Sequence, residues 1–144
     1  MLRKLIVAAL LFFVSTTPAA LAAGDPYLFD LLRKPGYKTY RTAWRAMLKP
    51  ERNLPTWLVR FSERGGSAVA GPSRWVTDGA RRLRHATVCR AHNCGPDYVW
   101  VLFTADGKRA WALHILPGAD GEQSRWYGKP DARMRALLQR LADE

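Results

Sequence analysis

Apolar residues recur with helical spacing in the segment 37–49, YKTYRTAWRAMLK. Pro50 follows this segment and cannot continue a helix, so the pattern ends where a helix would have to end. We therefore predict a helix here and a second, shorter one over YLFDLLRK, directly after Asp25 and Pro26. The residues at positions i, i+3, i+4, i+7 and i+8 of the longer helix form one apolar stripe, which predicts its core-facing side: Tyr40, Ala43, Trp44, Met47 and Leu48.

The middle of the chain changes to short apolar runs and to alternation, which are typical of strands. Gly71 and Pro72 interrupt the second of these runs and indicate an edge strand or a bulge. Asp78-Gly79 predicts a tight turn, and the segment 105–107 predicts a hairpin. Five consecutive strands without an intervening helix favour an antiparallel meander. The expected strands are TWLVRF (56–61), SAVAGPSRWV (67–76), RRLRHATVC (81–89), DYVWVLFT (97–104) and KRAWALHIL (108–116).

The end of the chain returns to helical spacing. Pro130 stands where a first helical residue is expected, and Asp131 suits the positive end of a helix dipole. The stretch GADGEQSRWYGK (118–129) is expected to be a loop or a short helical turn. The fold class predicted is α+β, a central five-stranded antiparallel meander flanked by N-terminal and C-terminal helices. The inward face of the last helix should hold Met134, Leu137, Leu138 and Leu141.

The first 22 residues have the three parts of a secretory signal peptide. Arg3 and Lys4 precede an apolar run from Leu5 to Val14, and Ala20-Leu21-Ala22 supplies the small residues of a cleavage site. The apolar run is shorter than the roughly 20 residues that cross a bilayer, so no membrane insertion is expected after cleavage. We predict a signal peptide over 1–22, a single domain over 23–144 and a periplasmic location.

The charge of the chain invites a nucleic-acid interpretation, but its distribution argues against one. Cleavage would remove two of the 23 basic residues and none of the 12 acidic ones, so the net charge would fall from +11 to +9. The basic residues are spread along the chain, and only RRLR (81–84) is dense. Because an exported protein rarely meets nucleic acid, a solvated surface or affinity for anionic envelope polymers explains the charge better.

Both cysteines of the chain lie in the segment 89–94, CRAHNC, with His92 between them. Zinc would require four ligands, and Cys89, His92 and Cys94 offer three at most, so no metal is predicted. A redox pair usually has two intervening residues at the start of a helix, whereas this pair has four between strands. A structural disulfide is the third interpretation and the one favoured, because exported chains meet an oxidising compartment.

A disulfide that closes so small a ring is worth only roughly 2 kcal/mol in the chain-entropy treatment, less than a bridge between distant segments. Its use is to order a loop in advance of binding, since each side chain immobilised on binding costs about 0.5–1.5 kcal/mol. The enclosed residues, Arg90 to Asn93, are polar or small and have no core to fill, so the loop is expected to project. The sequence has no motif of a hydrolase, metalloprotease or phosphate-binding enzyme; we predict no enzymatic activity and no cofactor.

The segment CRAHNCG resembles the CKPHDCG loop of the family of periplasmic inhibitors of vertebrate lysozyme, and LPTWL (54–58) resembles a strand of that family, LPAWV. The resemblance implies an antiparallel five-stranded sheet between helices and, usually, a homodimer. It also implies that the loop enters the active-site cleft of lysozyme, where the histidine contacts the two catalytic carboxylates. The target-binding residues would be Cys89, Arg90, Ala91, His92, Asn93 and Cys94.

Three positions of the loop depart from the family pattern. Ala91 stands for a proline, which is expected to loosen the free loop by about 0.4–1 kcal/mol. Asn93 stands for an aspartate, and Arg90 for a lysine. The sequence thus predicts an inhibitor of peptidoglycan-cleaving muramidases, with C-type lysozymes or lytic transglycosylases as partners. The alternative is a module that binds anionic envelope polymers through its arginine-rich face.

Overall fold

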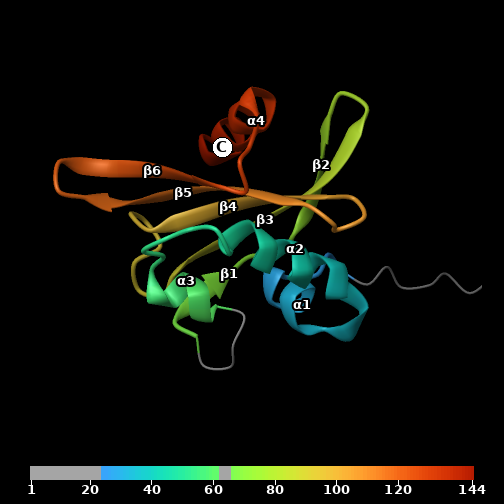
Figure 1. The fold of residues 1–144 in the computed structure, drawn as a ribbon, viewed down its shortest axis with the longest axis horizontal. Coiled ribbons are helices and arrows are strands. Elements are labelled where there is room, and N and C mark those ends of the chain that lie inside the picture. Colours follow the sequence, from blue (N-terminus) through green and yellow to red (C-terminus); the bar gives the residue numbers. More distant parts are fainter. Residues whose placement is uncertain (1–23, 62–65) are drawn as a thin grey trace, which may run out of the picture.

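The computed structural model describes residues 24–61 and 66–144 of the chain. A central antiparallel sheet lies between two helical layers, with three helices on one face and the C-terminal helix on the other (Figure 1). The predicted α+β class is confirmed. The predicted signal peptide lies outside the described residues. The helices are α1 (Leu28–Arg33), the 3-10 turn η1 (Pro35–Tyr37), α2 (Lys38–Leu48), α3 (Thr56–Arg60) and α4 (Ala132–Ala142).

In the described part of the chain the sheet has six strands, and five of them follow the order β1-β3-β4-β5-β6. β1 and β2 lie end to end along the same edge of β3, because the chain leaves the sheet between them at Gly71 and Pro72. The predicted interruption and the edge position are therefore confirmed. The strands are β1 (Ala68–Ala70), β2 (Arg74–Asp78), β3 (Arg81–Arg90), β4 (Tyr98–Thr104), β5 (Ala110–Gly118) and β6 (Gly121–Tyr127).

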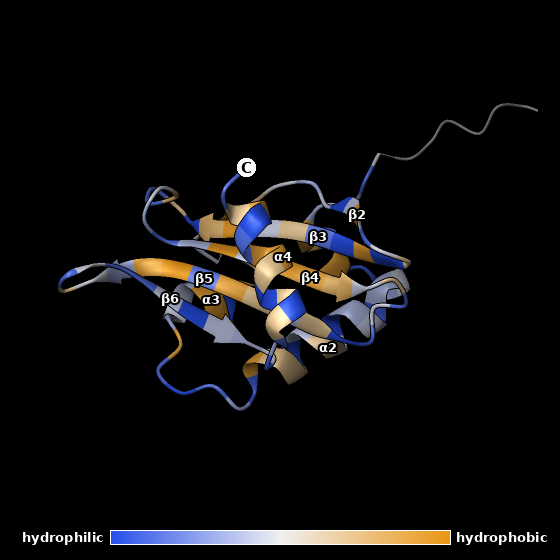
Figure 2. Ribbon diagram, turned by 90° about the horizontal axis from the view of Figure 1, so that it is seen from above, coloured by the Kyte–Doolittle hydropathy of each residue, from blue (hydrophilic) through white to orange (hydrophobic). Residues whose placement is uncertain are grey.

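Alternation along each strand divides the apolar residues between two cores. Ala86, Val88, Val99 and Val101 face α1, α2 and α3, whereas the neighbouring positions face α4. Apolar colour accordingly concentrates along β4 and β5, the two central strands (Figure 2). The predicted inward faces of α2 and α4 are buried in full, the first in one core and the second in the other: Tyr40, Ala43, Trp44, Met47 and Leu48, and Met134, Leu137, Leu138 and Leu141.

Helix α4 begins at Ala132, two residues later than expected. Asp131 is its N-cap, and the Asp131 carboxylate accepts a hydrogen bond from the backbone N–H of Met134 at 2.8 Å. Pro130 therefore precedes the helix instead of occupying its first turn. The two predicted turns are present: Gly79 and Gly107 adopt left-handed φ values of 60° and 69°, which glycine tolerates without steric cost.

The prediction of a strand over 56–61 was wrong, since this segment forms α3. Pro55 precedes the helix, and Trp57, Leu58 and Phe61 turn inward at helical spacing while Val59 is 50% exposed. A strand would have placed Trp57 and Val59 on the same face. A run of six residues fits either period, and packing against α1 and the sheet decides between them. LPTWL is likewise not a strand in this chain.

The prediction of a loop or helical turn over 118–129 was also wrong. Residues 121–127 form β6, which pairs with β5 from Ala112↔Tyr127 to Gly118↔Gly121. Most of β6 is exposed, so the strand carries no apolar alternation that a sequence pattern could detect. Its backbone hydrogen bonds come from β5, and this long-range pairing, not local preference, makes it a strand.

Candidate functional site

The segment 89–94, called here the cystine loop, lies at the turn between β3 and β4. These two strands pair antiparallel down to Cys89↔Tyr98, so the loop is the tip of a hairpin, as the sequence predicted. The Arg90 N–H donates to the carbonyl of Asp97 at 3.1 Å and extends the ladder by one bond. The loop therefore leaves the sheet from a base that hydrogen bonds hold closed.

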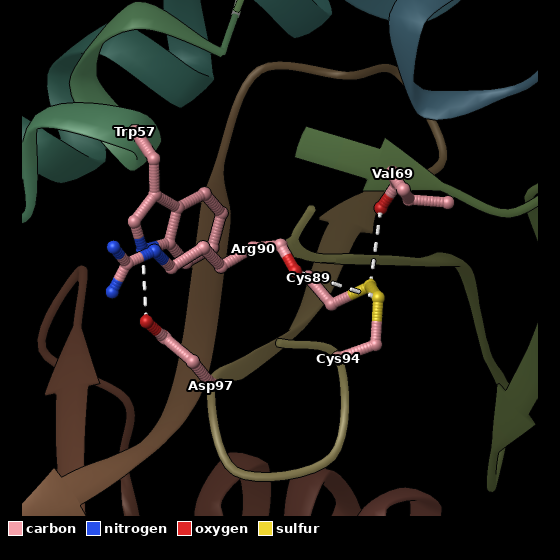
Figure 3. The surroundings of a disulfide bond; sticks show 6 residues. All are labelled: Trp57, Val69, Cys89, Arg90, Cys94 and Asp97. Atoms are coloured by element: carbon pink, nitrogen blue, oxygen red, sulfur yellow. Dashed lines mark hydrogen bonds between the residues drawn. A yellow bond between two sulfur atoms is a disulfide. The ribbon is translucent and has the colours of Figure 1, made fainter. Parts of the chain in front are cut away.

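Cys89 and Cys94 form the predicted disulfide. Cys89 is buried at the end of β3, whereas Cys94 is partly exposed. The Cys89 sulfur lies 3.6 Å from the carbonyl oxygen of Val69 in β1 (Figure 3). A disulfide sulfur carries no hydrogen, so this is a packing contact; it seats the bridge against the edge of the sheet. Across residues 24–61 and 66–144, no three His, Cys, Asp or Glu side chains gather as a metal site.

His92 is exposed at the tip of the cystine loop and has a φ of 63°. The Asn93 N–H donates to the Arg90 carbonyl at 3.0 Å, which closes a β-turn with His92 at its third position. A left-handed residue at that position is characteristic of a type II turn. Histidine enters this region more readily than most residues, although it still costs about 1–2 kcal/mol relative to glycine. The disulfide and the turn together hold the imidazole outside the body of the protein.

Ala91 is tied to the protein through its backbone. Its N–H donates to the carbonyl of Ser67 at 3.1 Å, next to the pairing of Ala68 with Arg90. A proline, which the resembling family has here, would suit the second position of this turn but could not make that bond. The hydrogen bond thus offsets some of the looseness expected from alanine. Arg90 is exposed and Asn93 partly exposed, so both side chains are accessible beside His92.

A buried polar network that the sequence analysis missed lies beneath the cystine loop. Asp97, which was expected to begin the strand 97–104, is only 5% exposed, and both of its carboxylate oxygens accept hydrogen bonds. The indole N–H of Trp57 in α3 donates to Oδ2 at 3.0 Å (Figure 3), and Nε2 of His114 in β5 lies 2.7 Å from Oδ1. Nδ1 of His114 lies 2.8 Å from the hydroxyl of Tyr127 in β6.

Burial determines the protonation of this network. Desolvation lowers the pKa of His114 below its ordinary value, against the opposing effect of Asp97, so the ring is neutral at neutral pH. Burial raises the pKa of Tyr127 to about 12, so its hydroxyl keeps its proton. The consistent assignment is that Nε2–H of His114 donates to Asp97 while Nδ1 accepts from Tyr127. Each of the three side-chain N–H and O–H groups then has an acceptor.

The arginine-rich segment at the start of β3 is engaged within the protein. The guanidinium groups of Arg82 and Arg84 each lie 4.0 Å from the ring centroid of Trp75. Arg84 is buried and also donates to the hydroxyl of Ser73, and Arg81 pairs with Asp78. These contacts withdraw Arg84 from the surface, whereas Arg81 and Arg82 remain exposed.

Comparison with known proteins decides the family. The family described as Inhibitor of vertebrate lysozyme (Ivy) matches residues 39–142, which include the cystine loop and all four network residues. The chain belongs to the inhibitor of vertebrate lysozyme family. Within it, the chain is 33% identical over 129 residues to a protein of Pseudomonas aeruginosa named inhibitor of vertebrate lysozyme, covering 83% of this chain and 79% of the relative.

Two further relatives have no assigned function in their names. An uncharacterised protein of Yersinia pestis is 31% identical over 125 residues, covering 81% of this chain and 76% of that one. A second uncharacterised protein of Pseudomonas aeruginosa is 27% identical over 108 residues, covering 69% and 66%. The resemblance inferred from the loop motif is therefore confirmed, and the inhibitor family provides the framework for the function of the site.

Proposed function

We propose that this chain is an exported inhibitor of peptidoglycan-cleaving muramidases that inserts its cystine loop into the active-site cleft of the target. The observation that carries the proposal is the exposed His92 imidazole, presented in a left-handed conformation at the tip of a disulfide-closed hairpin. Membership of a lysozyme-inhibitor family and the name of the Pseudomonas relative support this assignment.

The chemistry of the target explains why an imidazole is suitable. Retaining muramidases such as C-type lysozyme place a catalytic acid and a second carboxylate about 5 Å apart. A protonated imidazole has two N–H donors on opposite sides of its ring and can donate to both carboxylates at once. Such charge-assisted bonds are roughly twice as strong as neutral ones. Occupation of the cleft blocks the sugar and engages the acid, so inhibition requires no covalent step.

Export to the periplasm is part of this proposal and rests on the signal-like segment 1–22. Within residues 24–61 and 66–144, no helix is long and apolar enough to cross a membrane. The net charge of +9 expected after cleavage would slow the approach to a basic lysozyme but would affect the bound complex less, because salt screens exposed charges beyond about 8 Å. Lytic transglycosylases, which cleave the same polymer with an active-site acid, are therefore proposed as additional targets.

Replacement of His92 tests the proposal directly. His92→Gly removes the imidazole and retains a residue that accepts a φ of 63°, whereas His92→Ala removes it and adds backbone strain. Loss of a hydrogen bond to a charged group, worth about 1.5–3 kcal/mol, should weaken inhibition roughly 10- to 100-fold in both variants. The measurement is the inhibition constant against a vertebrate C-type lysozyme, and then against a lytic transglycosylase, from the turbidity of a cell-wall suspension.

Arg140→Ala serves as a control, because it removes an exposed charge from α4 and leaves the cystine loop intact. Full inhibition by the His92→Gly variant would refute loop insertion through this residue. The same titration at low and high salt separates the alternative function: binding of an anionic polymer should weaken steeply as salt rises, while a loop enclosed in a cleft should lose little. The homodimer implied by the family resemblance remains a prediction, which sedimentation of the mature protein would check.

A further inference from the structure

The disulfide alone does not determine the direction in which the cystine loop points. It joins Cys89 to Cys94 and fixes the shape of the ring, but a small ring can still tilt about the strands that carry it. Its enclosed side chains are polar or small, and none of them appears among the residues of either apolar core. The orientation of the loop must therefore be set by contacts at its base.

The backbone of Asp97 forms two hydrogen bonds at the base of the cystine loop. Its backbone carbonyl accepts the N–H of Arg90 at 3.1 Å, and its backbone N–H donates to the carbonyl of Asn93 at 3.2 Å. The main chain of this one residue thus contacts both sides of the loop. Its side chain points the other way, toward α3 and the sheet, where it is almost completely buried.

The carboxylate of Asp97 is held from two directions by rigid elements. Trp57 donates from α3, and His114 donates from β5. The hydroxyl of Tyr127 in β6 in turn fixes the His114 ring. The Trp57 and His114 rings also meet edge to face, with centroids 5.8 Å apart. Two directed bonds to one carboxylate leave it little freedom to rotate or shift, which a nonpolar contact of the same size would not achieve.

Stability alone gives a weak reason for such a network. A buried polar cluster can often be replaced by well-packed apolar residues at no cost in stability, so its distinctive contribution is geometric. Hydrogen bonds specify a distance and an angle, and here they specify them for the residue that closes the loop.

We propose that Asp97 is a positioning residue of the inhibitor: clamped by Trp57 and His114, it sets the orientation of the cystine loop and thereby the direction of the His92 imidazole. This inference rests on the proposed function for its effect on inhibition, and on the geometry of the free protein for its effect on the loop. Asp97 acts through His92 and need not touch the target.

The decisive experiment combines substitutions at the two positions. Asp97→Ala should weaken inhibition of a C-type lysozyme between about 3- and 30-fold, and Trp57→Phe, which removes one donor outside the loop, should weaken it less. Asp97→Asn should recover much of the loss, because its carbonyl can accept from Trp57 while its NH2 donates to the alternative tautomer of His114. In a His92→Gly background, Asp97→Ala should have almost no further effect.

A matched control separates positioning from general loss of stability. Leu141 lies in the core between α4 and the sheet, on the face opposite to α3. Leu141→Ala should lower the melting temperature without changing the inhibition constant. Inhibition is measured well below every melting temperature. The inference is overturned if Asp97→Ala is no worse than Leu141→Ala, or if its effect persists undiminished in the His92→Gly background.

A second measurement uses the free protein and is independent of the target. Amide hydrogen exchange at Arg90, Asn93 and Asp97 should accelerate at least several-fold in Asp97→Ala, relative to a Leu141→Ala variant of equal global stability. If His92→Gly inhibits fully, the proposed function fails, and hydrogen exchange then decides the positioning role alone. Unchanged exchange at these three amides would show that the network does not order the loop.

Discussion

Two buried histidines in neighbouring parts of the sheet differ in how completely their ring nitrogens are partnered. His114 faces α3, and both nitrogens are hydrogen-bonded, to Asp97 and to Tyr127. His85 in β3 faces the other layer; its Nδ1 accepts from Arg74 at 3.4 Å, while its Nε2 has no partner among residues 24–61 and 66–144. Both rings are buried, so burial does not distinguish them. His114 should stabilise the fold more than His85 does, because its two ring nitrogens both have hydrogen-bond partners.

The largest effect is expected from His114→Ala. Among the residues that the structure describes, the substitution leaves the buried Asp97 carboxylate with Trp57 as its one side-chain donor, and it deprives the Tyr127 hydroxyl of its acceptor. Breaking a buried pair in this way costs about 3–5 kcal/mol, which urea denaturation followed by tryptophan fluorescence would measure. His85→Ala is the matched truncation and should cost clearly less. Equal losses would remove the distinction between the two sites.

The next effect concerns acid stability and His85. Burial, followed by the charge of Arg74, lowers the pKa of His85 from 6.5 to about 4. Between these values the unfolded chain binds the proton more readily than the folded one, so the stability present above about pH 6.5 is lost as the pH falls. The leucine of His85→Leu cannot ionise, so the variant should be more resistant to acid. Its free energy of unfolding, measured relative to wild type, should be about 3 kcal/mol higher at pH 4 than at pH 7.

Denaturation midpoints of wild type and His85→Leu, compared at pH 7, 5.5 and 4, would check this. Some acid sensitivity should remain in the variant, because desolvation also lowers the pKa of His114. A constant difference between the two proteins across the three pH values would contradict the prediction.

The smallest effect is expected from Tyr127→Phe, which removes one hydroxyl and keeps the ring in the core. The His114 ring then loses its donor at Nδ1, at a cost of about 1 kcal/mol. Tyr40→Phe is the control, since its hydroxyl donates to the carbonyl of Ala105 at 3.1 Å in the β4–β5 turn, away from the network. The two variants should have similar stability, but only Tyr127→Phe should accelerate amide exchange in the cystine loop.

The elements that the sequence predicted correctly are those whose pattern is long and local. The stripe of α2 and that of α4 repeat over several turns, and the β4–β5 hairpin is marked by its turn residues. The cysteine spacing and the His92 motif led to the family. The errors fell where tertiary contacts decide: 56–61 is too short to have a readable period, and β6 is a strand because β5 pairs with it.

The network escaped prediction for the same physical reason. Each hydrogen-bonded pair in the network joins residues that are 13 to 40 positions apart in the sequence: Trp57 with Asp97, Asp97 with His114, and His114 with Tyr127. Each residue has an ordinary explanation where it stands: an aromatic core residue, a turn aspartate, a polar residue in a strand. Only the register of the strands and the packing of α3 bring them together. The one local hint is His114 itself, a polar residue within the apolar run of β5.

The order of these residues along the chain has a consequence for biogenesis. A polypeptide synthesised from its N-terminus completes the CRAHNC segment before His114 and Tyr127 emerge, so the disulfide and its turn can form while their support is still missing. The hairpin tip would then acquire its final orientation only when the last two strands dock. Nascent chains interrupted between β4 and β6 should accordingly carry an oxidised ring that is not yet competent to capture an enzyme.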